Sequence, residues 1–102
     1  KPSFACLSSR FPYGVRITPE GLRMVDLAEQ FLIDLGFSQV RVRYHGDIAR
    51  IEVYEEEIEK IIRKEIREKV YIRFKEIGFK YTALDLKGYR TGSMNEGLNL
   101  TV

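Results

Sequence analysis

The sequence predicts a single α+β domain, and three observations support this. One apolar helical pattern stops at Gly36, and a second stops at Gly78. After each glycine, an aromatic residue leads into a segment that is typical of a strand. Residues 45–47 then separate the first of these segments from another alternating one and indicate a hairpin turn. Helices interleaved with a hairpin in this way are typical of the α+β class.

The first helix is expected to begin at Thr18. The side chain of this residue can accept the free backbone N–H groups of the first turn, and Pro19 suits the first helical position, where no N–H is needed. Apolar residues at helical spacing mark the core face of this helix: Leu22, Val25, Leu32 and Leu35.

A longer helix is expected over residues 55–77. Its apolar positions recur at helical spacing, and charged residues fill most of the others. The apolar set is Ile58, Ile61, Ile62, Ile66, Val70, Phe74 and Ile77. Acidic residues come first and basic residues later, as the helix dipole prefers, so the charges indicate a solvated face rather than a binding site.

Four strands are expected, over residues 15–18, 40–44, 48–54 and 81–86. With the two helices they give the order βαββαβ, the ferredoxin-like arrangement, in which an antiparallel sheet carries both helices on one face. The glycine-rich C-terminal tail after Leu86 is polar and irregular. Because Tyr89, Arg90, Ser93 and Asn95 are concentrated in it, we expect this tail to fold back over a site.

Length and composition restrict the classes of function. The 102 residues suffice for one modest core, and a net charge of +2 gives no reason to expect a nucleic-acid partner. A single cysteine makes no internal disulfide, and neither a signal peptide nor a membrane-spanning run is visible. A cytoplasmic protein without membrane partners is therefore the expectation. The start at Lys1 favours a processed product or an excised piece.

Cys6 is the candidate reactive residue. A lone cysteine is more often a buried, inert side chain. Here Ser8, Ser9 and Arg10 follow it, and these are poor core residues, so we expect Cys6 on a polar loop or turn. The nearby cation would favour its thiolate, which is the nucleophilic form.

The middle strands carry a second candidate site. Strand alternation puts Arg41 and Arg43 on one face, and Arg50 and Glu52 share a face on the adjacent strand. Two arginines that project together could clamp a phosphate through forked hydrogen bonds. The alternative is a solvated sheet face on which Glu52 pairs with an arginine across the hairpin.

Five segments in order resemble one known family over roughly residues 2–96. The segments are Ala5–Gly14, Arg41–Arg43, His45–Asp47, Ala49–Val53 and Gly88–Asn95. They resemble the C-terminal part of the LarE family, the ATP-dependent sacrificial sulfur transferases that serve assembly of the nickel pincer cofactor of lactate racemase. In that family this part follows an N-terminal PP-loop domain that binds ATP.

The resemblance implies that this chain is the sulfur-donor and substrate-binding domain alone. ATP and Mg²⁺ would belong to the missing PP-loop domain, because residues 88–93 neither open an amphipathic helix nor offer the paired glycines that cradle phosphates. The implied partners are that domain and a small substrate, a pyridinium dicarboxylate mononucleotide. A homo-oligomer is also compatible. With one cysteine, the chain offers no iron–sulfur site, so no metal is expected.

The resemblance also implies residue roles. Cys6 would give its sulfur to an adenylated carboxylate of the substrate and end as dehydroalanine, so that each protein molecule acts once. The family comparison favours the phosphate clamp for the paired strand arginines, and Glu29 matches a polar active-site position. The complete set of implied substrate-binding residues is Arg10, Arg16, Glu29, Arg41, Arg43, Glu52, Arg90 and Ser93.

Two other classes of function stay open at this point. One is a small ferredoxin-like binding module for a phosphorylated metabolite or RNA, although residues 49–53 lack the stacking aromatics of an RNA-recognition strand. The other is a structural or oligomerisation domain in which Cys6 is incidental. His45 is interpreted as a solvated turn residue rather than a catalytic base.

Overall fold

In the computed structural model, which describes residues 4–91, helix α2 (Pro19–Asp34) begins where the sequence predicts. The hydroxyl oxygen of Thr18 accepts a hydrogen bond from the backbone N–H of Gly21 at 3.0 Å and so caps the helix. Gly36 follows the helix with φ at +104°, and Gly78 follows the last helix with φ at +132°. Both predicted helix ends are therefore confirmed.

The sheet has three strands in the order β1-β2-β3. Strand β1 (Val40–His45) and strand β2 (Ile48–Val53) form an antiparallel hairpin, with Val42 opposite Ile51. Strand β3 (Tyr81–Leu84) pairs with β2 in parallel, with Leu84 opposite Ile51. The sheet is therefore mixed.

The ferredoxin-like prediction is wrong for the described residues at one strand. Residues 15–18 form no strand, because their backbone closes a turn and leads into the helix cap: the N–H of Val15 donates to the carbonyl of Pro12 at 3.0 Å. In a ferredoxin-like sheet this strand lies between the strands that correspond to β2 and β3. Without it, those two strands pair directly, and a parallel pair replaces two antiparallel ones.

The long helix expected over residues 55–77 is divided into three pieces. These are the 3₁₀ turn η2 (Glu55–Glu57), helix α3 (Ile58–Ile61) and helix α4 (Lys64–Ile77), with an extended backbone at Arg63. One continuous helix would be about 34 Å long, whereas a six-residue strand spans about 20 Å. The break gives α4 a length that matches the sheet, and it leaves Ile62 exposed where the sequence predicted a core position.

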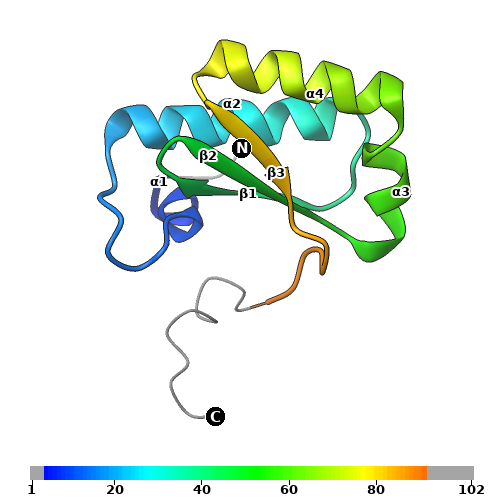
Figure 1. The fold of residues 1–102 in the computed structure, drawn as a ribbon. Coiled ribbons are helices and arrows are strands. Elements are labelled where there is room, and N and C mark those ends of the chain that lie inside the picture. Colours follow the sequence, from blue (N-terminus) through cyan, green and yellow to red (C-terminus); the bar gives the residue numbers. More distant parts are fainter. Residues whose placement is uncertain (1–3, 92–102) are drawn as a thin grey trace.

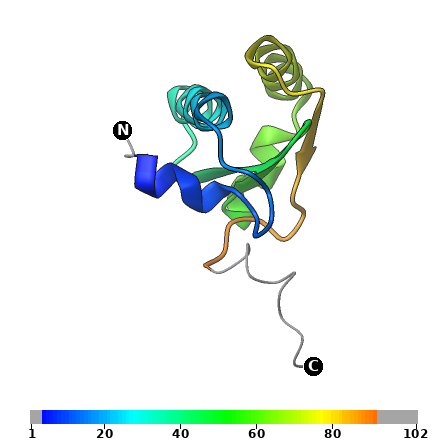
Figure 2. The same cartoon turned by 90° about the vertical axis from the view of Figure 1, so that its left-hand side faces the viewer.

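Helices α2 and α4 lie side by side on one face of the sheet (Figures 1 and 2), which confirms that part of the prediction. The core forms between them and the strands, and its members come from every layer. They include Met24, Ala28 and Leu32 of α2, Val70, Phe74 and Ile77 of α4, and Val40, Val42, Ala49, Ile51 and Val53 of the strands. A smaller cluster of Leu7, Phe11, Leu22 and Val25 attaches the N-terminal segment to α2.

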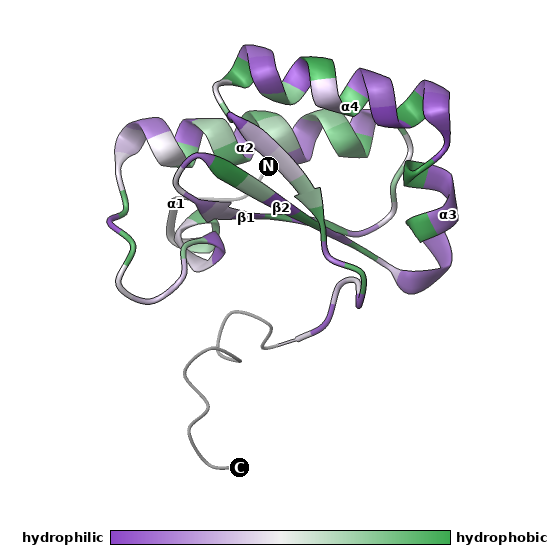
Figure 3. Ribbon diagram, viewed as in Figure 1, coloured by the Kyte–Doolittle hydropathy of each residue, from purple (hydrophilic) through white to green (hydrophobic). Residues whose placement is uncertain are grey.

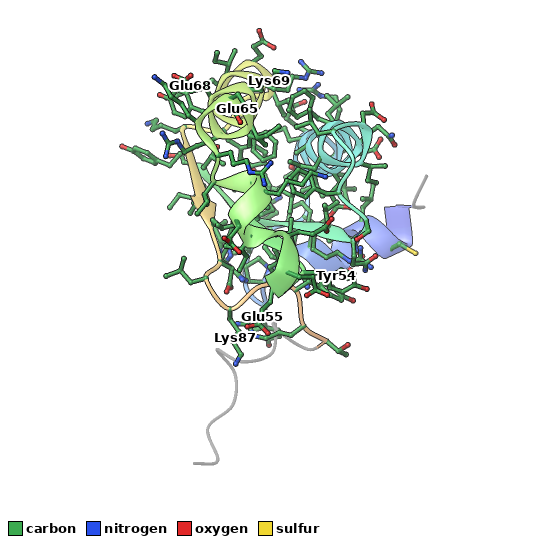
Figure 4. The ribbon with its side chains drawn as sticks, turned by 90° about the vertical axis from the view of Figure 1, so that its right-hand side faces the viewer. Tyr54, Glu55, Glu65, Glu68, Lys69 and Lys87 are labelled. Carbon is green, nitrogen blue, oxygen red and sulfur yellow. The ribbon has the colours of Figure 1, made fainter. Side chains whose placement is uncertain are left out.

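The outer side of α4 is charged, as its sequence pattern predicts. Apolar and polar positions alternate along this helix in Figure 3, and Figure 4 shows Glu65, Glu68 and Lys69 projecting from the outer surface. All three residues are exposed. Within residues 4–91, every helix is too short or too polar to cross a membrane.

Phe74 tests the position of the core. Its side chain is fully buried between α4 and the sheet, so Phe74→Ala is expected to lower the free energy of unfolding by about 3–5 kcal/mol. Ile72→Ala on the exposed side of the same helix is the matched control, with an expected change within about 0.5 kcal/mol. Urea unfolding measures both, and equal losses would contradict this packing.

Candidate functional site

Cys6 lies in a short helix rather than on the expected loop. Helix α1 (Phe4–Leu7) leads directly into the 3₁₀ turn η1 (Ser8–Arg10), and the cysteine is exposed. Leu7, the next residue, is buried in the smaller apolar cluster. This cluster therefore fixes α1 on the body of the protein while the cysteine faces outward.

Arg10 joins the cysteine helix to α2 through a buried ion pair. Its Nε donates to Glu29 Oε2 at 2.7 Å, and its Nη2 donates to Glu29 Oε1 at 3.0 Å. Its Nη1 donates to the backbone carbonyl of Cys6 at 2.9 Å. Both charged side chains are about 95% buried. The guanidinium thus fixes the backbone at Cys6 relative to α2.

Glu29 has a further partner, on the sheet. The backbone N–H of Val42 donates to Glu29 Oε2 at 2.9 Å. Strand β1 is an edge strand among the described residues, so this N–H points away from the hairpin partner β2. One carboxylate therefore satisfies a strand edge and an arginine together, which accounts for its burial.

These elements surround a cavity of about 410 Å³, here called the cysteine cavity. Its walls come from α1 and η1, from α2, and from the chain that enters β1. They are Cys6, Ser9, Arg10, Glu29, Ile33, Ser38, Gln39, Val40 and Arg41. The cavity brings an exposed thiol and an arginine from a different element to one place.

Arg41 is half-buried at the wall of this cavity. Its Nη1 donates to the carbonyl of Val40 at 2.8 Å, and its Cζ lies 5.3 Å from the ring centroid of Tyr89. Stacking occupies the face of a guanidinium and leaves its edges for hydrogen bonds. Such an arginine is suited to binding a carboxylate or phosphate oxygen.

Arg43, by contrast, takes part in a largely buried ion-pair network on the face of the sheet away from α2 and α4. Its Nη2 lies 2.9 Å from Glu52 Oε1, and Arg50 Nη1 lies 2.6 Å from Glu52 Oε2. Arg50 also pairs with Asp85 at 2.5 Å, and Asp85 pairs with Arg90 at 3.2 Å. Glu52 therefore pairs with an arginine across the hairpin, as the alternative interpretation has it, but the pair is buried and not on a solvated face.

Burial and charge shift two pKa values in this network. Burial alone would raise the pKa of Asp85, but the backbone N–H of Lys87 and the guanidinium groups of Arg90 and Arg50 together hold it below its ordinary value. Burial lowers the pKa of His45, the positive charges of Arg50 and Arg43 lower it further, and Glu52 opposes them. Arg50 Nε donates to His45 Nε2 at 3.2 Å, which requires an unprotonated acceptor nitrogen.

The predicted site residues therefore fall into separate groups. Cys6, Arg10, Glu29 and Arg41 meet at the cysteine cavity, whereas Arg43, Glu52 and Arg90 belong to the network beside it. Arg16 is exposed in the connection to α2 and does not line the cavity. Ser93 lies outside the described residues. The two strand arginines share a face, as predicted, but they have different partners.

Sequence reasoning missed Asp85 and underestimated Arg50. The period-2 alternation of the strands would have placed both residues on the same face of the sheet. Thr82 and Leu84 are the core-facing partners of β2, so Ala83 and Asp85 continue the opposite parity, toward the face that carries Arg50. The interpretation of His45 as a solvated residue also needs correction, because the ring is half-buried and hydrogen-bonded to Arg50.

A larger hollow of about 600 Å³ lies elsewhere, between α3, α4 and β3. Its walls are mainly apolar, and they include none of the residues that the sequence analysis assigned to a site. The smaller cavity is therefore the better candidate for a functional site, because the reactive and charged side chains line it. Across residues 4–91, no group of three or more His, Cys, Asp or Glu side chains could hold a metal ion.

Comparison with known proteins finds relatives that match nearly the whole chain. Over 98 residues it is 45% identical to the uncharacterized protein slr1717 of Synechocystis and 43% identical to the pyridinium-3,5-bisthiocarboxylic acid mononucleotide synthase of Lactiplantibacillus plantarum. The uncharacterized protein MJ0830 of Methanocaldococcus jannaschii is 33% identical over 90 residues. No protein-family model matches.

These matches cover 96%, 96% and 88% of this chain, in the same order. The chain spans only 37%, 35% and 34% of the respective relatives. It is thus homologous to about a third of each relative.

Removal of the buried carboxylate tests the Arg10–Glu29 pair. Glu29→Ala leaves the arginine charge buried without its partner and should lower the free energy of unfolding by about 3–5 kcal/mol. The double variant Arg10→Met with Glu29→Leu should recover much of that loss, since it removes both charges. Glu20→Ala, which removes an exposed ion pair with Arg23, should leave the urea midpoint nearly unchanged. A loss as small as that of the control would contradict a buried role.

The lowered pKa of His45 should make the free energy of unfolding depend on pH. Because the pKa of this side chain is lowered in the folded state, the unfolded chain takes up a proton first as the pH falls below about 6.5. Stability is therefore present above that pH and declines below it. His45→Gln should therefore reduce the change in the free energy of unfolding between about pH 7 and pH 5. Protonation of Asp85 affects stability only near pH 4 and below. An unchanged slope in the variant would contradict the assignment.

Proposed function

We propose that this chain is the sulfur-donor domain of an ATP-dependent sulfur transferase of the LarE family. Its partial homology to a mononucleotide synthase of L. plantarum supports a transferase role in cofactor biosynthesis. The observation that carries the proposal is the cysteine cavity, where the exposed thiol of Cys6 and the half-buried guanidinium of Arg41 line the same hollow. The proposed acceptor is a carboxylate of a pyridinium dicarboxylate mononucleotide.

In this proposal, the groups around Cys6 bind and orient rather than react. Arg41 binds an anionic group of the mononucleotide, since its guanidinium lines the cavity and its Nη1 donates to a backbone carbonyl rather than to a carboxylate. Arg10 is already committed to Glu29 and to the Cys6 carbonyl, so its role is to hold the donor segment in place. Arg43 and Glu52 support the sheet beside the cavity through their own ion pair.

The residues that the structure describes offer no site suited to ATP or Mg²⁺. The described part holds neither a glycine-rich cradle for a triphosphate nor a cluster of carboxylates for a metal ion. We therefore assign adenylation to an N-terminal PP-loop domain of the complete protein. That domain would deliver the acyl-adenylate of the substrate to the cysteine cavity.

The proposed transfer has two steps, which balance in atoms and charge. First, the Cys6 thiolate adds to the acyl carbon and AMP leaves, so that a C–S bond replaces the acyl–phosphate bond in a thioester. Second, a base takes the Cα proton of Cys6, the released electron pair forms the Cα=Cβ double bond, and the Cβ–Sγ bond breaks with its electrons on sulfur. The substrate then departs as a thiocarboxylate, and dehydroalanine remains at position 6.

Intact mass after turnover tests this proposal. Given ATP, Mg²⁺ and the dicarboxylate mononucleotide, the full-length protein is expected to lose the elements of hydrogen sulfide, with the loss on the peptide that contains Cys6. Product should stop at one sulfur per protein molecule. Without ATP, the mass should stay unchanged.

Variants at position 6 separate a donor from other kinds of cysteine. Cys6→Ala should form no thiocarboxylate, because alanine has no sulfur to give. Several turnovers with an intact Cys6 thiol and no added sulfur source would contradict the sacrificial step. A binding module without catalysis would instead retain the substrate and keep its full mass.

A further inference from the structure

The chain after β3 folds back onto the end of β2. Here the segment of residues 85–90 is called the return turn. The backbone N–H of Asp85 donates to the carbonyl of Ile51 at 2.9 Å, and that of Tyr89 donates to the carbonyl of Val53 at 2.6 Å. Figures 1 and 2 show this turn on the side of the sheet away from α2 and α4. Residues 85–90 thus fold back onto β2, whereas Ser93 and Asn95 of the predicted tail lie outside the described residues.

Gly88 allows this close approach. A Cβ atom at this position would lie 2.7 Å from the carbonyl oxygen of Val53 and 3.3 Å from the backbone nitrogen of Glu55, and neither backbone atom can move aside. Its φ of +89° also lies in the region that favours glycine. Figure 4 shows Lys87 of the turn next to Glu55, at the end of the molecule away from α4.

Side chains fix the same turn from both ends. Asp85 accepts hydrogen bonds from the backbone N–H of Lys87 and from the guanidinium groups of Arg50 and Arg90. Arg90 Nη1 also donates to the carbonyl of Gly88 at 2.8 Å. The return turn is thus held at Asp85 and Tyr89 by one strand carbonyl each, and the ion-pair network holds its side chains. The side chain of Tyr89 consequently has a defined place.

That place is between Tyr54 and Arg41. The ring of Tyr89 meets the ring of Tyr54 edge to face, with 6.0 Å between the centroids and 76° between the planes. The guanidinium of Arg41, which lines the cysteine cavity, stacks on the ring of Tyr89. A long, flexible arginine at a cavity wall would otherwise lose entropy on binding an anion.

We propose that Tyr89 is a positioning residue for anion binding in the cysteine cavity: its ring holds the Arg41 guanidinium so that the N–H edges meet an oxyanion of the substrate. This inference rests on the proposed function, since it concerns the same cavity. It extends that function by assigning a role to the return turn. The ligand class is a small molecule that presents a phosphate or carboxylate oxyanion to Arg41.

The experiment measures single-turnover sulfur transfer by the full-length protein against substrate concentration. Tyr89→Leu removes the aromatic face and should raise the half-saturating concentration about threefold to tenfold, with less than a twofold change in the maximal rate. Tyr89→Phe keeps the ring and should behave like the natural protein. Tyr71→Leu is the matched control, because it removes an exposed tyrosine that contacts Lys75 on α4.

A double-variant cycle shows whether Tyr89 acts through Arg41. In an Arg41→Ala background, Tyr89→Leu should have no further effect on the half-saturating concentration. A purely structural role would instead lower the melting temperature and weaken binding equally in both backgrounds, which would overturn the proposal. Should Tyr89→Leu fail to fold, Tyr89→Met fills the same space without an aromatic face and carries the same expectation.

The substrate series identifies the anion and separates this inference from the proposed function. With the dephosphorylated nucleoside, the difference between natural and Tyr89→Leu proteins vanishes when the oxyanion at Arg41 is the phosphate, and it persists when the oxyanion is a carboxylate. If the natural protein transfers sulfur and the Tyr89→Leu protein gives the same saturation curve, the positioning role alone is refuted. A natural protein that transfers no sulfur from Cys6 refutes the proposed function itself.

Discussion

The carboxylate of Glu29 is buried, and a buried carboxylate must find its hydrogen-bond donors inside the protein. It finds them in Arg10, which precedes α2, and in the backbone N–H of Val42 in β1. Since Arg10 also holds the carbonyl of Cys6, one side chain connects the cysteine helix, the long helix and the sheet edge. The position of the cysteine helix at the wall of the cavity depends on this connection together with the apolar contacts of Leu7.

A second carboxylate organises the other side of the hairpin. Glu52 is fully buried, with Arg43 and Arg50 as its partners, and Arg50 extends the network to Asp85 in the return turn. Buried charges of this kind stabilise a fold only while every partner is present. The network therefore favours one arrangement of hairpin and return turn, and this arrangement brings Tyr89 to Arg41. The two carboxylates thus act on the same cavity from two directions.

Local signals predicted the elements well where the chemistry is local. The Thr18 cap, the helix ends at Gly36 and Gly78, and the hairpin around Gly46 depend on neighbouring residues only, and all are confirmed. Strand pairing depends on distant segments. Residues 15–18 look like a strand by composition, yet turn and cap hydrogen bonds occupy their backbone. Their absence from the sheet made β2 and β3 neighbours, which no local pattern indicates.

The candidate site was predictable in its residue types but not in its pairings. Alternation placed Arg41 and Arg43 on one face and allowed Glu52 to pair across the hairpin, but it does not indicate that Arg43 is the partner while Arg41 stacks on Tyr89. Likewise, Glu29 on a helix resembles any surface glutamate until the edge of β1 meets it. These partners are determined by which residues lie close together in the folded protein. The spacing of residues along the chain does not predict them.

The origin of the transferred sulfur atom tests most directly whether Cys6 is the sulfur donor. Full-length protein prepared with cysteine that carries a heavy sulfur isotope should be mixed with ATP, Mg²⁺, the dicarboxylate mononucleotide and an excess of unlabelled sulfide. If Cys6 is the donor, the first thiocarboxylate formed carries the heavy isotope, and the Cys6→Ala protein forms no labelled product. Product that carries only unlabelled sulfur from the natural protein would contradict the claim that this domain gives away its own cysteine sulfur.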